Sequence, residues 1–290
     1  MKTRILTIAG SKGGTGKSAL LVQLGILLAE QGARVILVDG DLSGANLHTF
    51  FGLEDPDAHL DAVLLGRQEL LSSILPTGVP GLAMLPGVRR DLQPPVSQEH
   101  FRRWFRELRQ LEADWVLVDA GSGTSPWNLQ LAEGADLCLL TLNPEPTSIE
   151  REIRFVRGFC RFRLQSLSGG ESFPASGWLP VPWLAAIRRK KPQLASQLQA
   201  QLRRAPVGLI LNQVRTPEDR ELAEDCASVY RRFFGLDCHN LGWLPFDERL
   251  WLSIRERRPA VLEYPQSRWT ESVQRLVRQL LQESLWRSQS

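Results

Sequence analysis

The sequence predicts an α/β fold in which a doubly wound, mostly parallel sheet carries helices on both faces. Short apolar runs rich in Val, Ile and Leu recur seven times along the 290 residues, and helical patterns separate them. These runs are continuous rather than alternating, which is typical of strands covered on both faces. Four of the seven end in a polar residue, as expected where ligands bind at the carboxyl ends of parallel strands.

The predicted strands alternate with helices, and this alternation favours parallel pairing because each crossover has room for a helix. Asp39, Asp119, Asn143 and Asn212 follow the second, fourth, fifth and sixth strands. One such residue could be a plain turn former. Four of them at one sheet edge predict a binding site there. The seven strands are residues 5–9, 35–38, 82–85, 115–118, 137–142, 207–211 and 241–244.

The loop after the first strand has the composition of a phosphate-binding turn. Residues 12–18 read Lys-Gly-Gly-Thr-Gly-Lys-Ser and lead into a helical pattern over residues 19–28. Small residues let successive N–H groups and the helix N-terminus point at one anion. Lys17 would reach the terminal phosphates, and Ser18 would hold a magnesium ion. The usual pattern has glycine where this chain has Ser11, so it is broken at one position.

Composition favours one large domain over residues 1–290, since 43% of the residues are hydrophobic. No run approaches the roughly 18 uncharged apolar residues of a membrane span. Only four residues precede the predicted first strand, so we expect no signal peptide and a cytoplasmic chain.

The cysteines lie far apart and form no Cys-x-x-Cys motif, which disfavours a zinc site or a locally bound iron–sulfur cluster. We expect buried apolar roles for them. A cluster shared between two chains stays open. The four are Cys138, Cys160, Cys226 and Cys238.

Basic charge is concentrated in residues 151–205. This stretch has 11 Lys and Arg against 2 acids, or +9, so the rest of the chain carries −6 of the net +3. Residues 165–205 also interrupt the strand–helix rhythm with Gly, Pro and the run 188–191, which predicts an insertion at the surface. The stretch suits DNA, acidic lipid or an acidic partner. A solvated helix face and an insertion without function are the alternatives.

Lys12 is unusual, because an ordinary nucleotide loop needs only Lys17. A lysine at the start of the loop makes sense if it crosses into the site of a second molecule and neutralises phosphate charge, as an arginine finger does. With both lysines, the chain resembles the MinD/ParA group of ATPases. Their deviant Walker A loop carries the extra lysine, and they dimerise face to face around two ATP molecules. The resemblance extends over nearly the whole chain.

Five further segments are similar to the family's motifs and occur in the family's order. The resemblance implies that Asp41 orients the attacking water and shapes the magnesium shell, with Asp119 in the outer shell. It also implies that Asn212 reads the adenine edge, and that Pro245 lies near the base. The segments are 39–47 and 116–123, which match the two switches, and 143–148, 211–214 and 241–247.

The resemblance therefore implies ATP and Mg²⁺ as cofactors and a homodimer when ATP is bound. Slow hydrolysis would time a state that binds a protein activator or cargo. The expected ATP-binding residues are Ser11, Lys12, Gly13, Gly14, Thr15, Gly16, Lys17, Ser18, Ala19, Asn212 and Pro245; the catalytic residues are Lys12, Lys17 and Asp41; the metal site is Ser18, Asp41 and Asp119.

The switch segments look most like MinD and FlhG, which implies control over the placement or number of a cellular structure, the division site or flagella. An apolar helical stripe in residues 266–287 either anchors the chain reversibly to a membrane or packs on the sheet. A ParA-type partition ATPase that holds DNA through residues 151–205 is one alternative. An ATP-dependent metabolic ligase or an iron–sulfur carrier of related fold is another.

Overall fold

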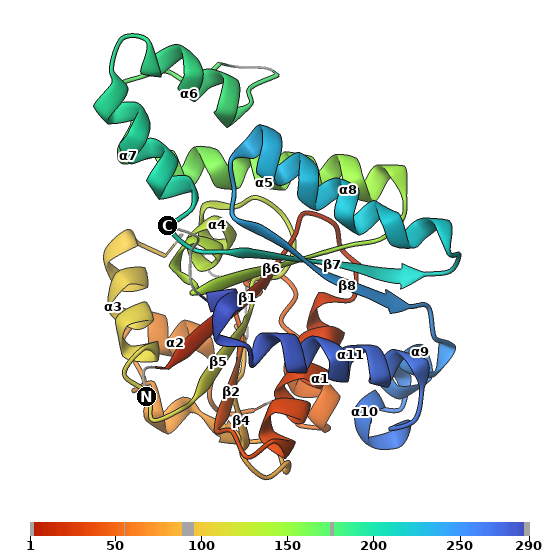
Figure 1. Cartoon of the computed structure of the whole chain (residues 1–290). Helices are drawn as coiled ribbons and strands as arrows, with labels where there is room; N and C mark the ends of the chain where they lie inside the picture. Colours follow the sequence, from red (N-terminus) through yellow and green to blue (C-terminus); the bar gives the residue numbers. More distant parts are fainter. Residues whose placement is uncertain (1–2, 55, 89–95, 175–176, 287–290) are drawn as a thin grey trace.

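An eight-stranded sheet forms the middle layer of the protein, with helices on both of its faces (Figure 1). The computed structural model describes residues 3–54, 56–88, 96–174 and 177–286. The strand order is β3-β4-β2-β5-β1-β6-β7-β8, and among these described strands only the β3–β4 pair is antiparallel. The predicted fold class is confirmed. The strands are β1 (Arg4–Ala9), β2 (Val35–Asp39), β3 (Leu75–Pro76), β4 (Leu82–Leu85), β5 (Trp115–Asp119), β6 (Leu137–Leu142), β7 (Val207–Val214) and β8 (Cys238–Pro245).

Two apolar cores, one on each side of the sheet, hold the helices in place. The larger core takes side chains from α2 (Leu60–Leu64), α3 (Gln98–Leu108), α4 (Pro126–Gly134), α5 (Pro146–Gln165) and α8 (Leu222–Val229). The other takes them from α1 (Lys17–Glu30), α10 (Ala260–Glu263) and α11 (Arg268–Leu280). The short helical turns are η1 (Leu47–Phe51), η2 (Leu71–Ser73), η3 (Glu218–Glu221), η4 (Tyr230–Phe234) and η5 (Glu283–Trp286).

All seven predicted strands are present, and two of them, β7 and β8, have a boundary that lies three residues from the predicted one. β7 continues to Val214, so Asn212 lies within this strand rather than after it. The β7–β8 pairing shifts its register twice, which the apolar pattern could not indicate. β8 begins at Cys238, three residues before the predicted start. β3 was missed because it has only two residues.

The predicted insertion is a pair of helices, α6 (Pro180–Arg188) and α7 (Pro192–Leu202), that stands away from the sheet (Figure 1). Arg163 holds the end of this helix pair, at Leu202, against the core. The buried guanidinium donates from Nε to Oε2 of Glu133 at 2.6 Å and from Nη1 to the carbonyl oxygen of Leu202 at 2.8 Å. One arginine of α5 therefore joins the ends of α4 and α7.

We expect Arg163→Ala to lower the free energy of unfolding by about 2 to 3 kcal/mol, because it removes the buried guanidinium from Glu133, which among the described residues keeps only its exposed partner Arg204 as an ion pair, and from the carbonyl oxygen of Leu202. Arg154→Ala, on the same helix, breaks an exposed pair with Glu150 and should cost under about 1 kcal/mol. Urea unfolding of both variants measures the difference. Equal losses would show that the buried contacts of Arg163 stabilise the fold no more than an exposed ion pair does.

The apolar stripe of the C-terminal helix packs inward, which is one of the two expected outcomes. Trp269, Val273, Leu276 and Leu280 of α11 are buried in the core that α1 shares. The helix ends at Leu280, so residues 266–287 are not one helix, and residue 287 lies outside the described residues. No helix in the described part of the chain is long and apolar enough to cross a membrane.

All four cysteines are buried free thiols, as predicted. Burial raises the pKa of the Cys138 and Cys160 thiols to about 12. Each thiol therefore stays protonated near neutral pH and acts as a small apolar group.

Candidate functional site

The loop between β1 and α1 presents free backbone N–H groups at a helix N-terminus. Gly16 caps α1 with a φ of 85°, no side chain caps the helix, and its first turn has no acidic residue. A Cβ at Gly16 would lie 2.4 Å from Nδ2 of Asn212, so only glycine fits there. Gly14 also has a positive φ, of 77°. The turn is therefore built to bind an anion.

Lys17 is the first residue of α1, and its ammonium group folds back over the loop. Nζ donates to the carbonyl oxygen of Lys12 at 2.9 Å, and the side chain is buried. Burial lowers the Lys17 pKa, while the nearby Asp119, Glu152 and Asp41 carboxylates raise it. A phosphate on the loop would meet this amine.

Two aspartates lie opposite each other at the carboxyl ends of adjacent strands, Asp39 on β2 and Asp119 on β5. Asp119 shares a side-chain hydrogen bond with Ser18 and accepts the N–H of Gly121 at 2.9 Å, while burial raises its pKa. Asp39 accepts the N–H of Leu47 at 2.9 Å, and burial raises its pKa to about 7. Asp39 therefore fixes the following loop, whereas Asp119 faces the phosphate-binding turn.

Asp41 is the point where the two predicted switch loops meet. Its Oδ1 accepts the N–H groups of Ser43 and Gly44, each at 3.0 Å. A Cβ on Gly121 would lie 2.5 Å from Cγ of Asp41, so the second loop approaches closely only because it has glycine there. Movement of either loop would therefore change the position or the contacts of the Asp41 carboxylate.

The predicted metal residues suit a magnesium ion that is bound together with a phosphate. Among the described residues, no three His, Cys, Asp or Glu side chains are placed to hold a metal. Magnesium often takes one or two protein groups and completes its shell with phosphate oxygens and water. The Ser18 hydroxyl beside the buried Asp119 carboxylate, at the mouth of the loop, fits that arrangement.

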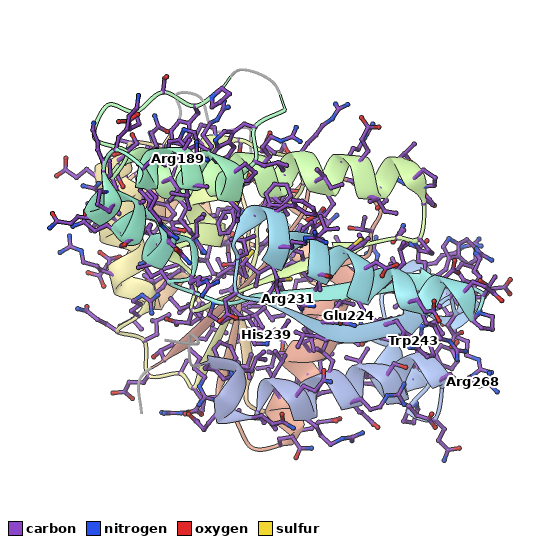
Figure 2. All side chains as sticks on the ribbon, turned by 45° about the horizontal axis from the view of Figure 1, so that its top comes forward. Arg189, Glu224, Arg231, His239, Trp243 and Arg268 are labelled. Atoms are coloured by element: carbon purple, nitrogen blue, oxygen red, sulfur yellow. The ribbon has the colours of Figure 1, made fainter. Side chains whose placement is uncertain are left out.

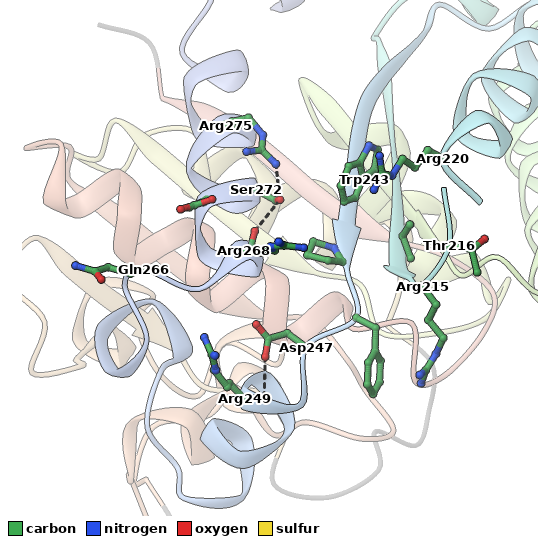
Figure 3. Close-up of a pocket in the computed structure, with 14 residues that line it drawn as sticks. Arg215, Thr216, Arg220, Trp243, Asp247, Arg249, Gln266, Arg268, Ser272 and Arg275 are labelled. Atoms are coloured by element: carbon green, nitrogen blue, oxygen red, sulfur yellow. Dashed lines mark hydrogen bonds between the residues drawn. The ribbon is translucent and has the colours of Figure 1, made fainter. Parts of the chain in front are cut away.

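A hollow of about 320 Å³ joins the loop to both switches and includes Lys17, Ser18, Ala19, Asp41 and Gly121 in its lining. Pro245 does not line it. Pro245 borders a separate hollow of about 820 Å³ between β7, β8 and α11, with Trp243 and Arg268 (Figure 3). The expected position of Pro245 near the base stays a prediction.

Asn212 and Gln213 brace the loop from β7. Asn212 donates from Nδ2 to the carbonyl oxygen of Thr15 at 2.8 Å and accepts the N–H of Gln213 at 2.9 Å. Gln213 has a φ of 59° and donates to the carbonyl oxygen of Gly14 at 3.1 Å. The sequence analysis missed Gln213, because a glutamine does not indicate that its backbone will have a positive φ. The adenine contact of Asn212 stays a prediction.

The second lysine is held by its own chain. Nζ of Lys12 forms an ion pair with Oε2 of Glu145, the residue that precedes α5. The side chain of Lys12 is 23% exposed and that of Glu145 is 51% exposed, so the pair lies at the surface. Lys12 can therefore exchange Glu145 for another anion at low cost.

Glu152 of α5 is a buried carboxyl beneath the loop that the sequence reasoning missed. Its Oε2 accepts the N–H of Ser11 at 3.4 Å, and its Oε1 has no hydrogen-bond partner in the described structure. Burial raises the Glu152 pKa to about 8, although the Ser11 N–H and Lys17 lower it. Glu152 precedes the buried Phe155 and Val156 by three and four residues, and this helical spacing was the available signal.

The raised pKa of Glu152 should make the thermal stability of the protein depend on pH. The unfolded chain ionises it near its ordinary pKa of 4.5, whereas the folded chain keeps its proton to about pH 8. The folded state then binds the extra proton, so Glu152 destabilises the protein as pH rises between these values. The Tm of Glu152→Gln relative to wild type should rise over that range and level off above it. Glu150→Gln, an exposed control, should show no such trend; a flat difference for Glu152→Gln would contradict the assignment.

Together, the uncapped helix N-terminus, the buried Lys17 and the Ser18–Asp119 pair at the ends of parallel strands define a phosphate-loop nucleotide-binding protein. The chain belongs to the CobQ/CobB/MinD/ParA family of nucleotide-binding domains, whose sequence profile matches residues 6–260. The predicted family is confirmed.

Individual relatives are distant. The antiactivator FleN of Pseudomonas aeruginosa is 24% identical over 91% of this chain and 81% of its own length. The septum site-determining protein MinD of Bacillus subtilis is 29% identical over 52% of this chain. The matched part covers only 57% of the length of that protein and of two other curated relatives. The structure of MinD with Mg-ADP from Pyrococcus horikoshii matches 97% of each chain with a TM-score of 0.66 at 23% identity, and supports the fold.

Proposed function

We propose that this protein is an ATP-hydrolysing molecular switch that dimerises around two ATP molecules. Lys12 supports the proposal most strongly. The loop needs one lysine for its own phosphates, and Lys17 lies there, whereas Lys12 points to Glu145 at the exposed rim. A second molecule facing this rim would offer phosphate charge in place of the Glu145 carboxylate. Lys12 would then stabilise the charge that develops on the partner's phosphates.

The remaining residues divide the work within one chain. The N–H groups around Gly14 and Gly16 and the amine of Lys17 bind phosphate, and Asn212 keeps the loop in shape. Ser18 and Asp119 would hold magnesium, which supplies charge neutralisation between phosphates when bound. Asp41, between the two switch loops, would orient the attacking water and report hydrolysis to both loops.

Control of the placement or number of a cellular structure is the function we infer for the switch. FleN, which is similar over most of this chain, is called an antiactivator, and MinD a septum site-determining protein. We infer that hydrolysis is slow and partner-stimulated and that the chain works in the cytoplasm, bound for part of its cycle to a partner. Membrane association through α11 would require the buried Trp269 and Leu276 to leave the core.

DNA is the second candidate partner, and the exposed run 188–191 favours it. Arg188, Arg189 and Lys190 at the end of α6 are exposed, and Lys191 pairs with Glu171. Arg189 lies on the helix pair at one end of the molecule, well away from Arg268 (Figure 2). A chromosome partitioning ParA of Caulobacter vibrioides is 31% identical over 56% of this chain.

Steady-state ATPase measurements test the class and the partner together. Purified protein is assayed alone, with DNA at two salt concentrations, and with vesicles of acidic phospholipid. Stimulation by DNA that falls with salt supports the partition alternative. Stimulation by vesicles supports a membrane-bound switch. Hydrolysis that requires a small organic acid would overturn the switch and support a ligase.

A further inference from the structure

Five large apolar side chains are exposed in the segment that follows β8. They come from the turn at Phe246, from α9 (Glu248–Arg255) and from α10. We call this set the α9 face. Its members are Phe246 (39% exposed), Trp251 (59%), Leu252 (37%), Ile254 (42%) and Leu262 (44%). α9 buries only Ser253, so these side chains add little to folding, and a cluster of this kind marks a binding surface.

The α9 face borders the phosphate-binding hollow. Ile254 lines that hollow together with Gly14, Lys17 and Asp41, although it is distant from them in the sequence. Val261 of α10 donates its N–H to Oε1 of Gln23 at 3.0 Å, which fastens α10 to the helix that begins at Lys17. Figure 1 shows α9 and α10 beyond the carboxyl end of β8. A molecule that covers the mouth of the hollow would therefore also meet α9.

Charge on this segment favours a protein partner. Residues 246–263 contain four arginines and four acids, a net charge of zero. Nucleic acid and acidic lipid both select positive surfaces, as in residues 151–205. An apolar centre with charges of both signs around it is instead typical of a protein interface. In a twofold contact, the arginines of one copy can meet the acids of the other.

We propose that the α9 face is buried against a second copy of this chain in the nucleotide-bound dimer. The proposal rests on the proposed function, in which two copies meet at the loop so that Lys12 reaches across. A twofold interface places the same surface of both copies together, so a surface that borders the hollow is covered with it. Burial of the α9 face then supplies apolar contact area that a pair of exposed lysines cannot.

Thiol protection measures this burial directly. The four native cysteines are buried, so Leu252→Cys adds an accessible thiol to the described part of the chain. Its reaction with a maleimide should slow about tenfold or more with a non-hydrolysable ATP analogue and should stay unchanged with ADP. The control is Leu71→Cys, at a residue that is 72% exposed in η2. That thiol should react at one rate in both nucleotides.

Trp251→Ser gives a second measurement that does not depend on labelling. It should weaken the dimer formed with the ATP analogue about tenfold or more, the effect of removing one strong contact residue. Binding of ADP to the monomer should not change, which shows that the variant is folded. Leu71→Ser should dimerise as wild type does.

The outcomes separate this inference from the proposed function. If wild type stays at its monomer mass of 32.7 kDa with the ATP analogue, the proposed function fails, and this inference fails with it. If wild type dimerises while the Leu252→Cys thiol keeps its full reactivity, the inference alone is overturned. Protection by acidic vesicles without any dimer would also overturn it and would assign the α9 face to a membrane.

Discussion

Lys12→Ala should bind ATP as wild type does and lose about a hundredfold or more of its turnover. The loss is of the size caused by removing a charged or hydrogen-bonding group that acts on the transition state. Binding should survive, because Lys17 donates to the backbone carbonyl of residue 12, which the substitution keeps. Fluorescence titration with a nucleotide analogue gives the affinity, and phosphate release gives the turnover.

Lys190→Ala is the control for Lys12→Ala, since it removes one exposed positive charge far from the loop. It should change neither quantity. Hydrolysis at the wild-type rate by Lys12→Ala would show that no lysine acts from a second molecule. A large loss of affinity would show that Lys12 serves its own nucleotide.

Asp41→Ala should accumulate as an ATP-bound dimer that does not turn over. Asp41 is the only side chain for which the family resemblance implies a role in orienting water, and its carboxylate is held by the N–H groups of Ser43 and Gly44. Without it, ATP and magnesium can still close the dimer, but the step that opens the dimer fails. Light scattering in ATP should give twice the monomer mass of 32.7 kDa, and wild type should return to monomer as ATP is consumed.

Ser43→Ala is the control, because it removes one hydroxyl donor to Asp41 and keeps the backbone donor. It should slow turnover only slightly and should not trap the dimer. A monomeric Asp41→Ala in ATP would count against the proposed role of the switch loops.

Much of the fold could be predicted because each central strand is a continuous apolar run. The runs at β1, β5 and β6 are buried along nearly their whole length, which gives an unambiguous pattern. β3 has two residues and no pattern, and the end of β7 depends on pairing with β8, which is not local in sequence. The packing of α11 could not be decided, since an apolar stripe is the same whether it meets a core or a lipid surface.

The part of the candidate site that is formed by short sequence motifs could be predicted. Gly16, Lys17, Ser18 and Asp119 lie together as the spacing indicated. The contacts that arise from distant segments were not predictable. Glu152 of α5 accepts the N–H of Ser11, a residue 141 positions away in the sequence, and Gln213 donates to Gly14 from a distance of 199 positions.

Mixing two inactive variants tests the central claim, that Lys12 acts in the site of a second molecule. Lys12→Ala keeps a complete site but offers no lysine, whereas Asp41→Ala offers Lys12 but has a defective site. In a mixed dimer, Lys12 of the Asp41→Ala chain would serve the intact site of its partner. We predict that phosphate release by an equimolar mixture rises well above the sum of the two variants alone, toward about a quarter of the wild-type rate, because random pairing makes half of the dimers mixed and each mixed dimer has one productive site. Activity equal to that sum, with mixed dimers present, would contradict the account.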